Sequence, residues 1–269
     1  MDALRQIDDW PSPAAAVAVV TPAGVVASRG PVGQVSGWAS VTKLVTALAA
    51  LVAVEEGAID LDQPAGPPGA TLRHLLSHCA GYGFAGDVLL AQPGTKRIYS
   101  NTGIEVAAVA VAEATGIAFP AYVREAVLDP LGLGLELHGS PAHGLHGNLD
   151  QLVLLAQELL APTLLAPETF AEATSVQFPG LDGVLPLFGR HTPCDWGLGF
   201  ELRDGKQPHW TGTTNSPRTF GHYGGSGSFL WVDPVAQVAL AGLSDLEAAA
   251  WLRDCWPRLA DAVLAELGR

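Results

Sequence analysis

Residues 37–43 read Gly37-Trp38-Ala39-Ser40-Val41-Thr42-Lys43, and the apolar segment 44–54 follows them without a break. No glycine or proline occurs between Ser40 and Glu56, and apolar residues fall on every side of the helical projection. This pattern predicts a helix that is buried all round and that ends at Gly57.

Ser40 and Lys43 form a candidate catalytic pair at the start of this helix. A hydroxyl at a helix N-terminus lies beside free amide N–H groups, which stabilise a developing oxyanion. Lys43 lies one turn further on the same face. Desolvation lowers the pKa of a lysine and can turn it into a base, which activates a neighbouring serine. Ser-x-x-Lys is also an ordinary helix start, so the rest of the chain must decide between the two interpretations.

Composition limits the classes of partner. The chain has 269 residues, enough for one large domain or two joined ones, and its apolar content supports a substantial core. Its formal net charge is -13, and lysine occurs only at Lys43, Lys96 and Lys206. Without a basic surface, we expect neither nucleic acid nor an anionic membrane as a partner. The sequence does not indicate an oligomeric state.

The N-terminus and the cysteines bear on the compartment. No basic start with a cleavage site is visible, and no apolar segment reaches the length that spans a bilayer. The three cysteines are widely spaced, with no Cys-x-x-Cys pair, and stand at Cys79, Cys194 and Cys255. We therefore expect a reduced, cytoplasmic location.

Strand patterns occur at both ends of the chain and helical patterns between them. The predicted strands are 14–21, 24–29, 34–38, 197–203, 226–232 and 237–243. The predicted helices are a short N-terminal one, 71–77, 102–114, 120–128 and 149–160. Asn148 and Gln151 form a capping box for the last of these, and Ser244 with Glu247 forms another that opens a C-terminal helix.

This order predicts one sheet built from both termini, with a helical region inserted. We assign residues 1–60 and 190–269 to an α/β sandwich subdomain and 61–189 to a mainly helical subdomain.

The segment Tyr99-Ser100-Asn101 is the second candidate constellation. A phenol has an unperturbed pKa near 10, and beside Lys43 it could be lowered far enough to exchange protons with Ser40. Asn101 could orient Lys43 and a substrate carbonyl through its amide. The alternative for Tyr99 is a half-buried packing residue.

The third constellation is the glycine-rich run Gly221-His222-Tyr223-Gly224-Gly225-Ser226-Gly227-Ser228. Clustered glycines on a strand permit close approach of a ligand to the backbone. For residues 225–227, a simple hairpin turn is the alternative.

At these three places the sequence resembles the penicillin-recognising serine hydrolases, in the branch that contains class C β-lactamases, D-alanyl-D-alanine carboxypeptidases and β-lactamase-fold esterases. Ser40 and Lys43 match the family's Ser-x-x-Lys motif, and Tyr99 with Asn101 matches its Tyr-x-Asn motif. The run 222–224 is similar to its Lys/His-Thr/Ser-Gly motif. Further similar stretches are Leu75-Leu76-Ser77-His78-Cys79-Ala80-Gly81, Asp129-Pro130-Leu131-Gly132 and Trp231-Val232-Asp233-Pro234.

The resemblance, which runs from about residue 14 to 243, implies an α+β fold of the β-lactamase/transpeptidase type. An antiparallel sheet would be flanked by helices, with an all-helical subdomain beside it and the site in the cleft between. Ser40 would be acylated, and Lys43 and Tyr99 would share the general base and acid roles. The backbone N–H groups of Ser40 and Gly225 would form the oxyanion hole, and His222 would line the pocket. The resemblance implies neither a metal nor an organic cofactor.

Two departures from the family pattern bear on the substrate. Tyr223 stands where the family has a small Thr or Ser hydroxyl that helps to bind a carboxylate, and His222 stands in place of lysine. The expected cytoplasmic location also separates the chain from penicillins and peptidoglycan. We therefore favour a serine hydrolase of small esters or amides. The alternatives are a β-lactam or D-amino-acid peptide hydrolase and a catalytically silent binding protein.

Other candidate sites are less well supported. Three histidines suggest a metal site, but they lie among Gly and Pro without carboxylates or cysteines at ligand spacing, and we interpret them as solvated: His138, His143 and His146. We interpret Cys79 as a buried structural residue, with His78 holding a loop by hydrogen bonds. The tryptophans are expected mostly in the core, and only Trp210, in a polar loop, is a candidate for the rim of a cleft: Trp38, Trp196, Trp210 and Trp231.

Overall fold

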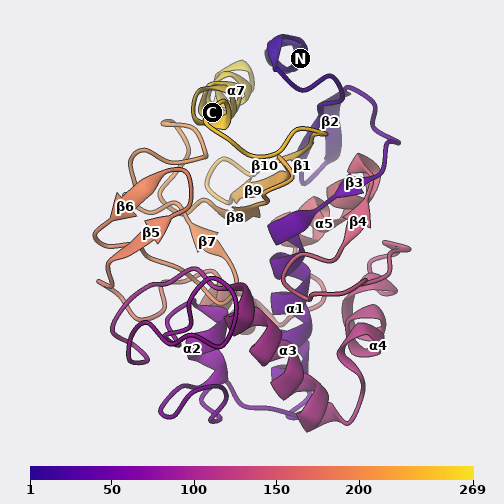
Figure 1. Ribbon diagram of the computed structural model, residues 1–269. Helices are drawn as coiled ribbons and strands as arrows, with labels where there is room; N and C mark the ends of the chain where they lie inside the picture. The colour runs from indigo at the N-terminus through magenta and orange to yellow at the C-terminus, as the bar shows by residue number, and fades with distance from the viewer.

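The computed structural model describes all 269 residues of the chain. At its centre lies an antiparallel six-stranded sheet in the order β2-β1-β10-β9-β8-β7, to which both ends of the chain contribute (Figure 1). Its strands are β1 Ala16–Thr21, β2 Gly24–Arg29, β7 Glu201–Leu202, β8 Phe220–Tyr223, β9 Phe229–Asp233 and β10 Val238–Leu243. Two small pairs lie outside it, β3 Ser36–Gly37 with β4 His146–Gly147 and β5 Gly183–Leu185 with β6 Gly189–His191.

The two faces of the sheet belong to two separate hydrophobic cores. Along β1, Ala16, Ala18 and Val20 join one core, whereas Val17 and Val19 join the other. Successive side chains of a strand point to opposite faces, so a strand covered on both sides is apolar at every position. The continuous apolar run of β1 follows from this double burial.

Helices cover both faces. They are η1 Ala3–Asp9, η2 Ala39–Val41, α1 Thr42–Glu55, α2 Leu72–Leu76, α3 Asn101–Thr115, α4 Phe119–Val123, the π-helical η3 Arg124–Leu128, α5 Leu149–Leu160, α6 Pro167–Ala173 and α7 Leu252–Glu266. In Figure 1, α7 lies near the N-terminus on one side of the sheet, and α1 to α4 lie on the other. No single helix is long and apolar enough to cross a membrane. Helix α3 and the segment 119–128 reach that length and composition only together, and a bend of 86° separates them.

Helix α1 is the central element of the larger core. It contacts α3, α4 and η3 as well as strand β8. Its apolar residues are buried on every side, as the sequence pattern predicts.

The predicted fold class is confirmed, and several elements match closely. The capping box of Asn148 and Gln151 is present at the start of α5. The prediction of a capping box at Ser244 and Glu247 is wrong, since α7 begins only at Leu252. The Ser244 hydroxyl is instead bonded within a turn to both the N–H and the carbonyl of Leu246.

Other differences have local causes. Strand 197–203 is reduced to β7, because Gly197 donates to the carbonyl of Phe200 and Gly199 has a left-handed φ of +81°. The strand predicted at 226–232 begins only at Phe229, as β9. Residues 225–227 form a turn, which favours the alternative of a simple hairpin turn there. Helix α6 and the β5–β6 hairpin were not predicted.

The division into subdomains stays a prediction. Helix α5 lies within the segment 61–189, yet it packs against β1, β9 and β10. Its apolar face is buried in the same core as the sheet residues Ala16 and Ala18. An amphipathic helix is stabilised by burying that face, wherever the chain offers an apolar surface.

Replacing Leu48 in α1 by alanine is expected to lower the free energy of unfolding by about 2–5 kcal/mol, because the side chain is 0% exposed and leaves a cavity. Val109→Ala on α3 serves as the control, since Val109 is 56% exposed and its change should stay within about 0.5 kcal/mol. Urea unfolding of both variants measures the difference. Equal losses would contradict the central position of α1.

Candidate active site

Ser40 lies in the 3₁₀ turn η2, directly before α1. The preceding residue, Ala39, has a left-handed φ of 43°, which turns the chain sharply into the helix. The turn is held from the other end of the chain, since the Ser228 hydroxyl donates to the carbonyl of Trp38 at 2.7 Å. Gly224 lies so close that a Cβ there would stand 2.6 Å from the same carbonyl oxygen and 3.0 Å from Ala39 Cβ. The third motif therefore needs glycine at this position.

Lys43 is fully buried and contacts Ser40. Its Nζ lies 3.0 Å from Ser40 Oγ, 2.7 Å from Asn101 Oδ1 and 3.0 Å from the carbonyl oxygen of Ala142. Burial lowers the pKa of Lys43 to about 7, and the charge of Glu105 opposes this only in part. A large fraction of the amine is therefore neutral near pH 7 and able to accept the proton of Ser40.

Tyr99 lies over the same pair. Lys43 Nζ is 4.9 Å from the centroid of its ring. Burial of the phenol raises the pKa of Tyr99, and a hydrogen bond with Ser40 offsets only part of the rise. The expected lowering of this pKa beside Lys43 is thus wrong, because desolvation of the phenolate outweighs the effect of a nearby amine that is itself only partly charged. Tyr99 is a protonated phenol that can pass on a proton.

Asn101 begins α3 and fixes the second motif. Its side-chain oxygen accepts from Lys43, as proposed for the orientation of the amine, and its backbone N–H donates to the carbonyl of Phe84 at 2.8 Å. Ser100 caps the helix by accepting from the N–H of Gly103 at 2.9 Å. The tight cap holds Tyr99 and Asn101 in register with Lys43.

His222 is buried on β8 and carries no charge. Its Nδ1 donates to the carbonyl of Tyr223 at 2.7 Å, while Nε2 has no partner. Burial and the neighbouring Lys43 lower the pKa of His222 to about 3. Tyr223 donates its hydroxyl to the carbonyl of Pro186, which occupies that hydrogen. Neither side chain supplies a cation or a free small hydroxyl for a carboxylate.

Ser40 opens into a cavity of about 240 Å³. The backbone N–H groups of Ser40 and Gly225, both part of its lining, donate to no protein acceptor. The other lining residues are Phe84, Tyr99, Pro186, Leu187, Trp196, His222, Tyr223 and Ala248. The structure therefore brings all eight predicted site residues to one place: Ser40, Lys43, Tyr99, Asn101, His222, Tyr223, Gly224 and Gly225.

Several lining residues were not predicted. Trp196, expected in the core, is 1% exposed and also lines the cavity, where its ring lies 5.9 Å from the centroids of both Tyr99 and His222. Trp210, expected at a rim, is instead 1% exposed. No sequence signal distinguishes the two tryptophans, because long-range packing decides which of them reaches the cavity.

Two other sequence candidates have structural roles. His78 Nδ1 accepts from the N–H of Ser100 at 3.2 Å, and Cys79 is buried. No group of three or more His, Cys, Asp or Glu side chains has an arrangement that could hold a metal ion.

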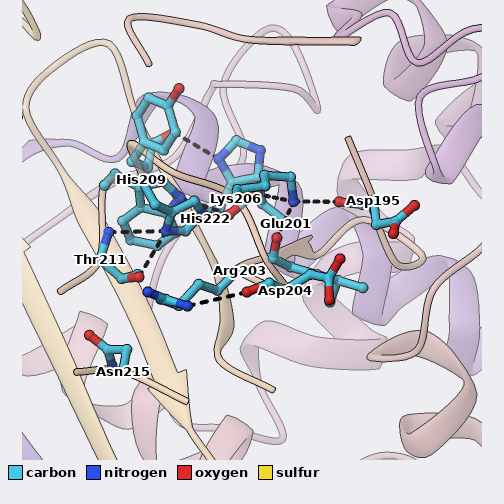
Figure 2. A network of polar contacts seen from close by, with 12 residues as sticks. Asp195, Glu201, Arg203, Asp204, Lys206, His209, Thr211, Asn215 and His222 are labelled. Carbon is cyan, nitrogen blue, oxygen red and sulfur yellow. Dashed lines mark hydrogen bonds and ion pairs between the residues drawn. The ribbon is translucent and has the colours of Figure 1, made fainter. Parts of the chain in front are cut away.

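A buried ion network lies beside β8 (Figure 2). The Glu201 carboxylate lies 2.8 Å from both Lys206 Nζ and His209 Nε2, and Trp210 Nε1 donates to it at 2.7 Å. Burial alone would raise the pKa of Glu201, but His209 and Lys206 lower it to about 2. Glu201 pairs with Gly221 on β8, so the network supports the strand that carries His222.

Glu201→Gln is expected to lower the free energy of unfolding by about 3–5 kcal/mol, since it leaves the buried Lys206 ammonium without its counter-ion. Asp62→Asn is the control. It removes an exposed partner of Arg73, and a change of at most about 1 kcal/mol is expected. Urea unfolding at pH 7 compares them. Equal stabilities for both variants would show that the Glu201 pair is not a buried electrostatic unit.

Three solved structures are similar to this chain over nearly its whole length. The crystal structure of a beta-lactamase from Mycobacterium bovis is 51% identical in sequence, covers 98% of each chain and gives a TM-score of 0.96. A mutant of the simvastatin synthase LovD from Aspergillus terreus is 19% identical over 99% of this chain and 94% of its own, with a TM-score of 0.80. EstCE1, a hydrolase with promiscuous acyltransferase activity, is 18% identical over 98% and 97% of the two chains, with a TM-score of 0.79.

A search of curated proteins finds no match. The family model described as Beta-lactamase matches residues 5–264, which is nearly the whole chain. Together with the relative from Mycobacterium bovis, this match shows that the chain belongs to the beta-lactamase family.

Proposed function

We propose that the protein hydrolyses small esters or amides through an acyl-enzyme on Ser40. The observation that carries this proposal is the 3.0 Å contact between Ser40 Oγ and a buried Lys43 whose pKa is about 7. A general base is most effective when its pKa lies near the operating pH. A serine hydroxyl beside such a base is an activated nucleophile.

Acylation follows from the positions of the nucleophile, the base, the oxyanion-binding N–H groups and the phenol. Ser40 Oγ attacks the carbonyl carbon and its proton moves to Lys43 Nζ. The N–H groups of Ser40 and Gly225 stabilise the oxyanion that forms. As the carbonyl re-forms, the bond to the leaving oxygen or nitrogen breaks. Tyr99 gives its phenolic proton to the leaving atom and is reprotonated from Lys43, so the base is restored.

Deacylation repeats the steps with water. A water molecule attacks the acyl carbon while Lys43 accepts its proton, and the bond between the acyl carbon and Ser40 Oγ breaks. The proton returns to Ser40, which leaves the free acid as product and the enzyme in its starting state.

The third motif supports a substrate without a carboxylate next to the scissile bond. His222 is neutral and the Tyr223 hydroxyl is bonded to Pro186. A buried anion needs a charged or hydrogen-bonding partner, and this position offers no cation. The second candidate, a β-lactam hydrolase, is favoured by the 51% identity to a structure described as a beta-lactamase. The third candidate is a catalytically silent binding protein.

Intact-mass analysis after incubation with a fluorophosphonate probe tests the enzyme proposal. Wild type is expected to gain a single adduct, and Ser40→Ala none. Turnover of a phenyl ester but not of a chromogenic cephalosporin is expected from the adduct-forming protein. Faster cephalosporin turnover would favour the β-lactam hydrolase, and no adduct with wild type would favour the silent binding protein.

The rate of this labelling is expected to depend on pH through Lys43. Below its pKa of about 7 the ammonium cannot accept a proton, so the rate should fall about tenfold per pH unit and reach a plateau above pH 7. Lys43→Gln cannot act as a base and should label about 10²- to 10⁴-fold more slowly, without this inflection. The same inflection in wild type and Lys43→Gln would assign it to another group.

A further inference from the structure

A second hollow adjoins the catalytic cavity. It measures about 440 Å³ and shares Phe84, Tyr99 and Pro186 with the cavity that holds Ser40. Leu90 and Val184 extend its apolar lining away from the nucleophile. The two hollows therefore adjoin at these three residues, and a substrate long enough to pass them would extend from Ser40 into this groove.

The groove is a fixed feature of the fold. One wall is the loop 82–90, where Asn101 N–H donates to the Phe84 carbonyl at 2.8 Å and Ser100 Oγ donates to the Gly83 carbonyl at 2.6 Å. The opposite wall is the segment that begins β5, where the Asp182 carbonyl accepts from the N–H of Arg97 at 3.0 Å.

Gly183 is required for the close approach of this second wall. A Cβ on Gly183 would stand 2.6 Å from the carbonyl oxygen of Arg97.

These walls expose large apolar side chains. Phe84 is 59% exposed, Leu90 62% and Val184 55%. Exposed apolar side chains that gather on hydrogen-bonded segments around a hollow mark a surface that a ligand covers. The groove suits an extended apolar chain.

The same groove carries the chain's one exposed lysine. Lys43 and Lys206 are buried and bonded, whereas Lys96 lines the groove, is exposed and forms no ion pair. The other charged side chains along it neutralise one another or are occupied: Arg190 pairs with Asp182 at 2.9 Å, and the buried Arg97 guanidinium donates to backbone carbonyls. In a protein with a net charge of -13, an uncompensated cation at this position selects for an anion.

We infer that the groove takes the apolar chain of an ester substrate whose far end carries a carboxylate, bound by Lys96. The inference rests on the proposed hydrolysis at Ser40 and adds the substrate class to it. The anion is recognised at the far end of the chain and not beside the scissile bond, where His222 is neutral and Tyr223 is occupied.

Matched ester pairs test this inference. In one pair, the acyl chain of a nitrophenyl ester ends either in a carboxylate or in its methyl ester. In the other pair, the alcohol chain of an acetate ester carries the same two ends. Wild type is expected to show a kcat/KM about threefold to tenfold higher for the carboxylate form in one pair, and the preference should weaken with added salt. The pair that shows it identifies the chain that lies in the groove.

Variants separate local recognition from net charge. Lys96→Gln should abolish the preference by lowering kcat/KM for the carboxylate form to the level of the methyl-ester form. Arg253→Gln removes the same charge from an exposed position on α7 and should keep the preference. Val184→Ser should reduce kcat/KM for both forms of the long ester but not for phenyl acetate, because only the long chains reach the groove.

Three results would overturn the inference. If phenyl acetate is hydrolysed but kcat/KM is equal for the charged and neutral forms in both pairs, this inference alone is overturned. Equal effects of Lys96→Gln and Arg253→Gln on the preference would also overturn this inference alone. Failure to hydrolyse any ester, together with no fluorophosphonate adduct on Ser40, would overturn the proposed function and this inference with it.

Discussion

The burial of the Lys43 amine is the constraint on which the site depends. A charged ammonium in the apolar surroundings of α1 is costly, and the fold offers it three oxygen contacts but no carboxylate within ion-pair distance. The result is a pKa of about 7, which suits a general base. A carboxylate paired with Lys43 would hold the amine charged. The lack of a direct counter-ion, which is a cost to stability, is therefore what permits proton transfer from Ser40.

The sheet supplies the rigidity that this arrangement needs. β8 is held on one side by β9 and on the other by β7, whose Glu201 is fixed in a buried ion network. The strand leads into Gly224, which packs against the turn that carries Ser40. The two buried ionisable groups Glu201 and Lys43 thus have opposite surroundings. The charge of Glu201 is balanced by Lys206 and His209, and the network stabilises the fold. Lys43 has no counter-ion in contact and is the proposed base.

The sequence predicted the parts of the site that depend on local chemistry. The apolar run around α1, the cap at Asn148 and the glycines of the third motif have local signatures, and the family resemblance is confirmed. Long-range properties were missed. The pKa of Tyr99 depends on how deeply other segments bury its phenol, and Trp196 reaches the cavity only through tertiary packing. Such effects arise from the assembled fold, and no short pattern encodes them.

The proposed substrate recognition follows from the positions of the charged side chains around the site. The family motif places a hydroxyl and a cation beside the nucleophile, but Tyr223 directs its hydroxyl to Pro186 and His222 is neutral. Removing a cation from that position also keeps positive charge away from Lys43, whose pKa a further cation would lower still more. Lys96 lies in the adjoining groove and is exposed to solvent, which screens its charge. In the proposed function, anion recognition at Lys96 therefore leaves the base Lys43 undisturbed and exchanges a small polar subsite for a longer apolar one.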